Sequence, residues 1–175
     1  MYKTFFFLSS LLLSSHVSAA DTELKADMVQ RRQAVMEGMD ERGMLILFSA
    51  DTAHYSGDVE YEFRQENNLY YLTGIRQPNT TLVLMPQNSS RKEFLFLPAR
   101  NPERELWAGR TLSPEEAREI SGIETVWNAS EFDSFIDSVL YGSPYRSGGS
   151  RSSEYQDFFT DLQEGDVDIF FLLES

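Results

Sequence analysis

The sequence predicts an α/β domain in which a mixed β-sheet is flanked by helices. Short apolar runs of strand length, at 44–48, 81–85 and 93–97, alternate with segments in which apolar residues recur at helical spacing. Such alternation is typical of layered α/β domains. The chain has 175 residues, of which 41% are hydrophobic, and this is enough for one domain with a packed core.

The first twenty residues have the pattern of a secretory signal peptide. Lys3 precedes an apolar stretch from Phe5 to Leu13, and the small residues at 17–20 offer a cleavage site. The apolar stretch is shorter than the roughly 20 residues that a membrane-spanning helix needs. We therefore expect an exported, periplasmic or secreted protein with a mature domain at 21–175, and a retained anchor is the alternative.

The first half of the mature chain predicts one helix and three strands. Apolar side chains recur at helical spacing over 24–39, which indicates an amphipathic helix that ends near Gly43. The continuous apolar run at 44–48 then predicts an interior strand. The runs at 81–85 and 93–97 predict two further strands joined as a hairpin.

The second half opens with a well-marked helix. Ser113 and Glu116 have the spacing of a capping box, a proline stands at the first helical position, and Gly122 ends the segment. A brief strand is expected at 123–127. Ser130 is expected to cap the next helix, which carries an apolar stripe as far as Leu140.

The last part of the chain predicts a Gly/Ser/Arg-rich loop at 142–152, a helix at 155–162 and a buried strand at 167–173. An apolar strand of this kind normally leads into another element that covers it. The sequence stops two residues later, and we therefore expect a chain that is cut short rather than finished.

Charge and composition exclude several classes of function. The formal net charge is −13, which argues against nucleic acid and anionic membranes as partners. The chain contains no cysteine, so thiol catalysis and thiolate metal sites are excluded. His16 lies in the expected signal peptide, so only His54 remains and a multi-histidine metal site is excluded. His54 stands in a polar segment and is interpreted as a loop residue rather than a base.

The segment 58–74 holds the first candidate site residues, Asp58 and Arg64. Acids and Arg64 alternate with apolar residues there, which predicts an exposed extended segment with its polar side chains on one face. The bland interpretation is an Arg–carboxylate pair that fixes a loop. Asn67-Asn68 is then expected to cap an aromatic helical turn that Gly74 ends.

The segment 101–110 holds the second candidate, Trp107, in what is expected to be a polar loop after a strand. A tryptophan in a loop either fills a local core or offers a flat face to a ligand or partner. The sequence contains no phosphate-binding glycine loop, nucleophile elbow or zinc-protease helix motif.

In order and spacing, several segments resemble the N-terminal domain of aminopeptidase P, also called Xaa-Pro aminopeptidase. The resemblance covers about residues 27–140 and is most specific in the tyrosine-rich segment followed by Leu-Trp-x-Gly-Arg. The matching segments are the Arg31-Arg-Gln helix, the strand at 44–48, the segment 56–74, the strands at 82–85 and 94–97, and residues 105–110.

The resemblance implies a mixed sheet flanked by helices, as in creatinase and prolidase relatives, with a ribonuclease H-like arrangement. It implies that catalysis belongs to a C-terminal pita-bread domain, where two aspartates, a histidine and two glutamates hold two metal ions, usually manganese. Those ligand motifs do not occur here. No catalytic or metal-binding residue is therefore expected within this chain, which alone is expected to be inactive.

For this domain the resemblance implies a cleft wall and subunit contacts in a homo-oligomeric peptidase. Asp58, Arg64 and Trp107 match the wall: Asp58 for the free α-amino end of a peptide or for orienting an arginine, and Trp107 for closing the pocket, in its own or an adjoining subunit. The alternatives are a stand-alone binding or oligomerisation module, and a periplasmic carbohydrate- or peptide-binding protein that uses its aromatic loops.

Overall fold

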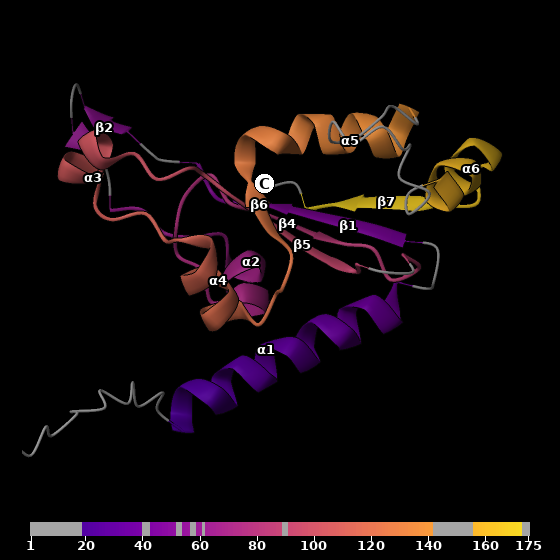
Figure 1. Ribbon diagram of the computed structural model, residues 1–175, viewed down its shortest axis with the longest axis horizontal. Helices are drawn as coiled ribbons and strands as arrows, with labels where there is room; N and C mark the ends of the chain where they lie inside the picture. The colour runs from indigo at the N-terminus through magenta and orange to yellow at the C-terminus, as the bar shows by residue number, and fades with distance from the viewer. Residues whose placement is uncertain are drawn as a thin grey trace, which may run out of the picture.

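A five-stranded mixed β-sheet forms the centre of the molecule, with strand order β6-β5-β4-β1-β7 (Figure 1). The computed structural model describes residues 19–39, 43–51, 54–56, 59–60, 62–88, 91–141 and 156–172. The strands of the sheet are β1 (Gly43–Phe48), β4 (Thr81–Leu84), β5 (Glu93–Leu97), β6 (Val126–Asn128) and β7 (Asp168–Phe171). The short strands β2 (His54–Ser56) and β3 (Val59–Glu60) pair with each other apart from it.

The pairing of the strands confirms the predicted mixed sheet. β1 pairs antiparallel with β4, with Leu45 opposite Leu84, and β4 pairs antiparallel with β5 as the predicted hairpin. β6 is parallel to β5, and β7 is parallel to β1. β1 therefore lies inside the sheet, as its continuous apolar run predicts.

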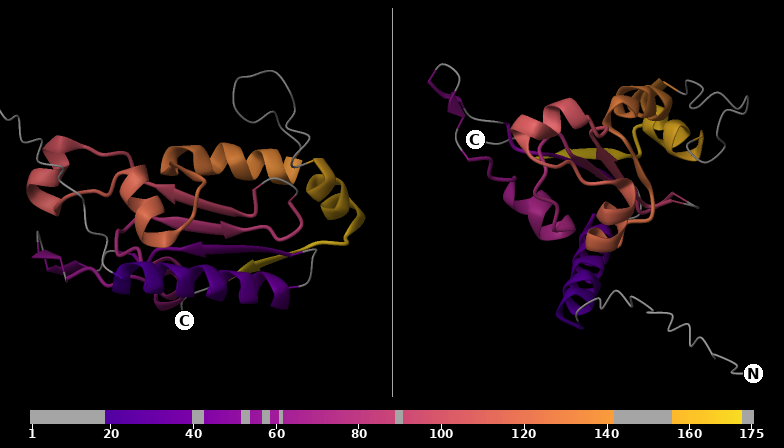
Figure 2. Two further views of the ribbon diagram at one scale, coloured as in Figure 1. Left: turned by 60° about the horizontal axis from the view of Figure 1, so that its bottom comes forward. Right: turned by 60° about the vertical axis from the view of Figure 1, so that its left-hand side comes forward.

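Helices cover both faces of the sheet (Figures 1 and 2). One face is covered by α1 (Ala19–Gly38), α2 (Asn67–Thr73) and α4 (Pro114–Ser121), and the other by α5 (Phe132–Tyr141) and α6 (Gln156–Glu164). Alternate strand residues feed the two layers, because successive side chains in a strand point to opposite faces. Ile46 therefore packs on the face of the sheet that α5 covers, whereas Leu47 packs on the face that α2 and α4 cover.

The layer under α5 is an aromatic cluster. The Phe135 ring of α5 lies 5.1 Å from the Phe94 ring and 5.3 Å from the Phe96 ring, measured between centroids. Trp127 of β6 lies 5.2 Å from Phe94. All three phenylalanines are fully buried. These rings hold α5 against the middle of the sheet.

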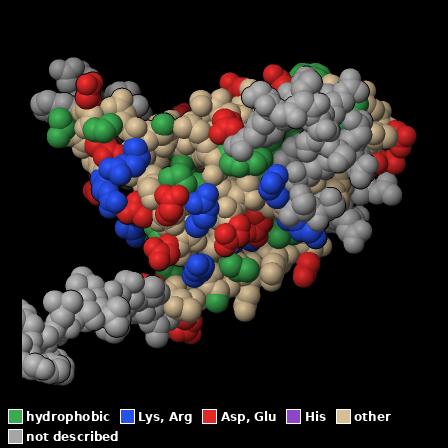
Figure 3. Space-filling model, in the orientation of Figure 1, with side chains coloured by type: hydrophobic (Ala, Val, Ile, Leu, Met, Phe, Trp, Pro, Cys, Tyr) green, Lys and Arg blue, Asp and Glu red, His purple; other side chains and the backbone are tan. Residues whose placement is uncertain are grey.

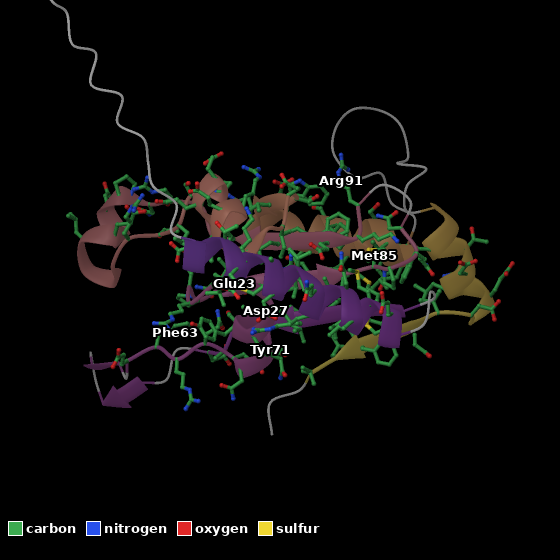
Figure 4. All side chains as sticks on the ribbon, turned by 90° about the horizontal axis from the view of Figure 1, so that it is seen from below. Glu23, Asp27, Phe63, Tyr71, Met85 and Arg91 are labelled. Atoms are coloured by element: carbon green, nitrogen blue, oxygen red, sulfur yellow. The ribbon has the colours of Figure 1, made fainter. Side chains whose placement is uncertain are left out.

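A buried arginine fastens α1 to the opposite layer. The Arg32 side chain is completely buried, and its Nε donates to Glu93 Oε1 at 3.0 Å. Its Nη1 donates to the Leu72 carbonyl oxygen at 2.7 Å, next to the end of α2. The neighbouring Arg31 contacts Asp27 and lies over the Tyr71 ring, where Figure 4 shows α1 against α2.

The predicted signals around α4 are confirmed. The Glu116 amide donates to Ser113 Oγ at 3.2 Å, and the Ser113 amide donates to Glu116 Oε2 at 2.9 Å, which completes the capping box. Gly122 ends the helix with φ of 74°, in the left-handed region that favours glycine.

Three element boundaries differ from the sequence-based predictions. α1 ends at Gly38 rather than near Gly43, in keeping with the low helix propensity of glycine. α2 is capped by Glu66 and not by Asn67, because the Glu66 carboxylate accepts from two orphan amides, those of Asn68 and Leu69. Gly74 ends α2 as predicted. The brief strand expected at 123–127 is β6, which begins three residues later and ends one residue later.

The helix expected to start at Ser130 is capped differently. Asn128 Oδ1 accepts from the Ser130 amide at 2.9 Å and starts a short 3₁₀ turn (Ala129–Glu131) that leads into α5. Ser130 is therefore inside the turn and is not the cap.

Two further predictions are wrong. The segment 101–110, expected to be a loop, contains the helix α3 (Pro102–Ala108), whose first turn is capped by Asn101 Oδ1 accepting from the Glu103 amide at 3.0 Å. The strand β7, expected to be buried, lies at the sheet edge, where Phe171 is 51% exposed.

The helix expected at 155–162 is confirmed as α6. The predicted loop at 142–152 lies outside the described residues, as does most of the expected signal peptide.

Among the helices of the described ranges, none is long and apolar enough to cross a membrane. Ala19 and Ala20, which flank the expected cleavage site, form the first turn of α1.

Candidate functional site

A hollow of about 860 Å³ lies at the end of the molecule that carries α3. It opens between the chain leading into α2, the turn after α2, and the segment that runs from the end of β5 to the start of α4. Its polar and charged lining residues are Glu62, Arg76, Gln77, Asn79, Arg100, Asn101, Glu105, Arg110 and Thr111. Figure 3 shows acidic and basic side chains intermingled at this end of the molecule.

The two segments chosen from the sequence meet at this hollow. Glu62 and Phe63 come from the first segment, and Figure 4 shows Phe63 on the extended chain before α2. Glu105, Gly109 and Arg110 come from the second. Sequence reasoning selected both segments, and residues from each line this one concavity, but Arg64 is not among the lining residues.

A series of hydrogen bonds made by the Gln65 and Gln77 side chains connects the segments around the hollow. Gln65 is 8% exposed, and its Oε1 accepts from the Ala50 amide at 3.2 Å and the Glu66 amide at 2.9 Å. Its Nε2 donates to the Gln77 carbonyl oxygen at 2.8 Å. Gln77 Oε1 in turn accepts from the Leu112 amide at 2.6 Å. The two glutamines therefore set the separation of the two walls of the hollow.

Replacement of Gln65 by leucine is expected to lower the free energy of unfolding by about 1–3 kcal/mol, because the Ala50 amide and the Gln77 carbonyl would each lose a partner in a buried place. Urea denaturation followed by circular dichroism measures this change. The matched control is Gln33→Leu on the exposed side of α1, for which less than about 0.5 kcal/mol is expected. Equal effects of the two substitutions would show that the contacts of Gln65 are energetically unimportant.

The charges of the hollow are arranged in pairs. Arg100 binds Glu105 with two contacts, Nε to Oε1 and Nη2 to Oε2, both at 2.9 Å. Arg110 donates to Glu116 Oε1 at 2.5 Å, from the rim of the hollow to the first turn of α4. Arg76 donates to the Tyr70 hydroxyl at 3.0 Å and lies over that ring. Arg76 and Arg110 thus bring positive charge to the lining.

The hydrogen bond from Arg100 lowers the pKa of the Glu105 carboxyl to about 2, and the Thr111 amide adds to the effect. The same contact raises the pKa of Arg100. Glu116 also has a lowered pKa, chiefly because its carboxylate accepts from the Ser113 amide. These carboxylates stay ionised at any physiological pH, so they serve as fixed charges and not as general acids.

The depressed pKa of Glu105 predicts a stability change in acid. Because the folded-state pKa is below the ordinary value of 4.5, the Arg100–Glu105 pair stabilises the fold above pH 4.5 and loses this contribution between pH 4.5 and about 2. Glu105→Gln is therefore expected to destabilise the protein at pH 7 and to have a much smaller effect at pH 2.5. Denaturant unfolding at both pH values measures it, with Glu103→Gln in the same helix as the control. A pH-independent effect would contradict the assignment.

The predicted site residues are placed to different extents. Arg64 is exposed on the chain before α2, and its Nη2 donates to Asn67 Oδ1 at 3.3 Å. This contact of Arg64 is with a side-chain amide and not with a carboxylate. Asp58 lies outside the described residues. Trp107 has its backbone in α3, and His54 has its backbone in β2, but both side chains are outside the described part.

Gln65, Gln77, Arg76 and Arg100 were missed by sequence reasoning. A buried glutamine has no local sequence signature, and the two arginines acquire their place only through the fold. In the part of the chain that the structure describes, no three His, Cys, Asp or Glu side chains gather in a way that would hold a metal ion. The described lining of the hollow consists of paired charges, amides and a few apolar side chains.

Comparison with known proteins identifies the domain. The family model of the aminopeptidase P N-terminal domain matches residues 28–146. The chain belongs to this family. The aminopeptidase P N-terminal domain accounts for the mixed sheet and its helices, and the resemblance seen in the sequence is confirmed.

Relatives of this domain are considerably longer proteins. The chain is 32% identical over 116 residues to the Xaa-Pro aminopeptidase of Haemophilus influenzae, covering 66% of this chain and 27% of that relative. It is 32% identical over 113 residues to human Xaa-Pro aminopeptidase 3, covering 62% of this chain and 22% of the relative. The chain thus spans about a quarter of the length of the curated relatives it matches.

Solved structures agree with this assignment. The domain superposes on an aminopeptidase P from Bacillus anthracis with a TM-score of 0.66 at 27% identity, covering 84% of this chain and 38% of that one. It superposes on Escherichia coli aminopeptidase P, in a structure with the inhibitor Pro-Leu, with a TM-score of 0.64 at 25% identity, covering 84% and 36%.

Proposed function

We propose that this domain is the non-catalytic N-terminal part of an exported Xaa-Pro aminopeptidase, in which the hollow beside α3 forms one wall of the substrate cleft. The observation that supports the proposal is the convergence of the 62–63 and 105–110 segments on a single concavity. Ligand pockets often lie where domains meet. The expected signal peptide at 1–20 supports export to the periplasm or the medium.

In this proposal the chain binds and orients the peptide. Asp58 meets the free α-amino end or orients a neighbouring arginine, Arg64 belongs to the cleft wall, and Trp107 closes the pocket in its own or an adjoining subunit. Two manganese ions, held by a separate C-terminal domain, would supply the activated water when bound. The residues described above that line the hollow hold fixed charges and amides, which suits positioning of a peptide.

The intact mass of the native gene product tests the proposal. The product is purified from its source with an antibody to residues 21–175 and weighed by mass spectrometry, and its hydrolysis of an Xaa-Pro peptide is assayed with manganese. A mass several times that of this chain, together with manganese-dependent hydrolysis, is expected. A mass equal to residues 21–175 without activity would replace the proposal with a stand-alone binding or oligomerisation module.

A further inference from the structure

Arg76 is the one arginine of the hollow's lining that is not paired with a described carboxylate. Arg100 and Arg110, the other two arginines of the lining, are bound to Glu105 and Glu116. Within the described part of the chain, no carboxylate lies within 4.0 Å of the Arg76 guanidinium. The lining therefore contains an exposed positive charge that the described residues do not neutralise.

The side chain of Tyr70 holds this guanidinium in place. Arg76 Nη2 donates to the Tyr70 hydroxyl at 3.0 Å, and Arg76 Cζ lies 5.1 Å from the centroid of the ring. A guanidinium has five N–H donors, and this hydrogen bond uses one of them. Because the orientation of the side chain is already set, its other donors can meet a ligand at a lower cost in conformational entropy.

Hydrogen bonds also fix the backbone on both sides of Arg76. Ile75, which precedes it, is completely buried, and the Ile75 amide donates to Thr73 Oγ1 at 3.1 Å. Gln77 follows it, and the Gln77 carbonyl oxygen accepts from Gln65 Nε2 at 2.8 Å. Arg76 is therefore carried by a well-anchored turn, as a side chain that orients a ligand needs to be.

The charge of the hollow is opposite to the charge of the whole chain. The chain has 28 acidic and 15 basic residues, and its net charge is −13. The described lining of the hollow has three arginines against two glutamates, which leaves a balance of one positive charge. On an acidic protein, a locally positive hollow favours an anionic group at that place over the rest of the surface.

We propose that Arg76 binds a carboxylate of the peptide in the hollow, and that the enzyme therefore favours peptides with a negative charge after the proline. This inference rests on the proposed function and adds a specificity-determining residue to it. A guanidinium binds a carboxylate through parallel, charge-assisted hydrogen bonds. Arg76 repels the positively charged α-amino end of the peptide, so the carboxylate belongs to the part that follows the proline.

Four peptides test the inference on the complete gene product, purified from its source and supplied with manganese. Ala-Pro-Glu and Ala-Pro-Gln, both with amidated C-termini, differ in a side-chain carboxylate. Ala-Pro-Ala with a free or an amidated C-terminus tests the terminal carboxylate. In at least one pair, we expect the KM of the charged peptide to be about fivefold lower, with little change in kcat. The pair that shows the difference identifies which carboxylate Arg76 binds.

Variants assign the preference to Arg76. Arg76→Gln is expected to bring the KM ratio of the neutral and charged peptides to about one. Arg76→Lys is expected to keep part of the preference, because lysine retains the charge but not the planar fork of donors. Lys92→Gln is the matched control, because it removes one positive charge from an exposed position outside the lining of the hollow, and it is expected to keep the full ratio.

The possible failures of the two proposals are distinguishable. Hydrolysis of all four peptides without a difference within either pair would overturn the inference and leave the proposed function intact. A preference that persists in Arg76→Gln, or that Lys92→Gln abolishes, would also overturn the inference. If none of the peptides were hydrolysed, the proposed function itself would be wrong, and the role of Arg76 would fall with it.

Discussion

Replacement of Arg32 by methionine is expected to lower the free energy of unfolding by about 3–5 kcal/mol. The methionine fills most of the space of the arginine, but it leaves Glu93 without its ion-pair partner and the Leu72 carbonyl oxygen without a donor. Both losses occur at the junction of α1, α2 and β5, where the arginine side chain is fully buried. Urea denaturation of the two proteins measures the difference.

The neighbouring arginine provides the control. Arg31→Met removes an ion pair with Asp27 and the stacking on Tyr71, but these contacts are partly exposed and are expected to contribute about 1 kcal/mol or less. A comparable loss of stability in the two variants would show that Arg32 does not fasten α1. Glu93→Gln in the Arg32→Met background should recover part of the loss, since it removes the unpaired carboxylate.

Replacement of Phe135 by alanine is expected to destabilise the domain by about 3–5 kcal/mol. The ring is fully buried and lies within 5.1–6.0 Å of the Phe94, Phe96 and Trp127 rings, so its removal leaves a cavity between α5 and the sheet. The same denaturation experiment, followed by tryptophan fluorescence, measures the effect.

Phe171→Ala is the control for this second prediction. It also removes a phenylalanine ring, but the ring is 51% exposed at the sheet edge, and the expected change is smaller than about 1 kcal/mol. If Phe171→Ala cost as much as Phe135→Ala, the edge position of β7 would be wrong.

Local sequence patterns were sufficient for most of the sheet and for α4. Three apolar runs gave β1, β4 and β5 nearly residue for residue, because such runs have a short, fixed length in a strand. The capping box and the glycine at the end of α4 act within one helical turn. Such features depend on neighbours in sequence, so they are visible without the fold.

The wrong predictions concern features for which two local signals compete or for which the tertiary structure decides. The segment 101–110 was predicted as a loop from its polar composition, although Asn101-Pro102 is a helix-start signal and α3 begins there. Glu66 replaced Asn67 as a cap because its longer carboxylate reaches two amides. The exposure of β7 could not be predicted, since an apolar run has the same composition at the edge as in the middle of a sheet.

The sequence was sufficient to select the two segments of the candidate site, but it did not show how their side chains are arranged around the hollow. The unusual composition around Arg64 and the motif around Trp107 drew attention to both walls of the hollow. The link through Gln65 and Gln77 joins residues as far as 35 positions apart, and nothing local in the sequence specifies it. Nothing local in the sequence distinguishes Arg32 from the other charged residues of its helix, and only the fold shows that it is buried.

The most direct test of the central claim is the turnover of an Xaa-Pro peptide by the purified chain itself. The protein, shown to be folded by a cooperative unfolding transition, is incubated with the peptide with and without manganese, beside the E. coli Xaa-Pro aminopeptidase as a positive control. No release of the N-terminal residue above the buffer rate is expected. Turnover that an active-site titrant abolishes at one equivalent per chain would show that this domain carries catalysis, and would contradict the account.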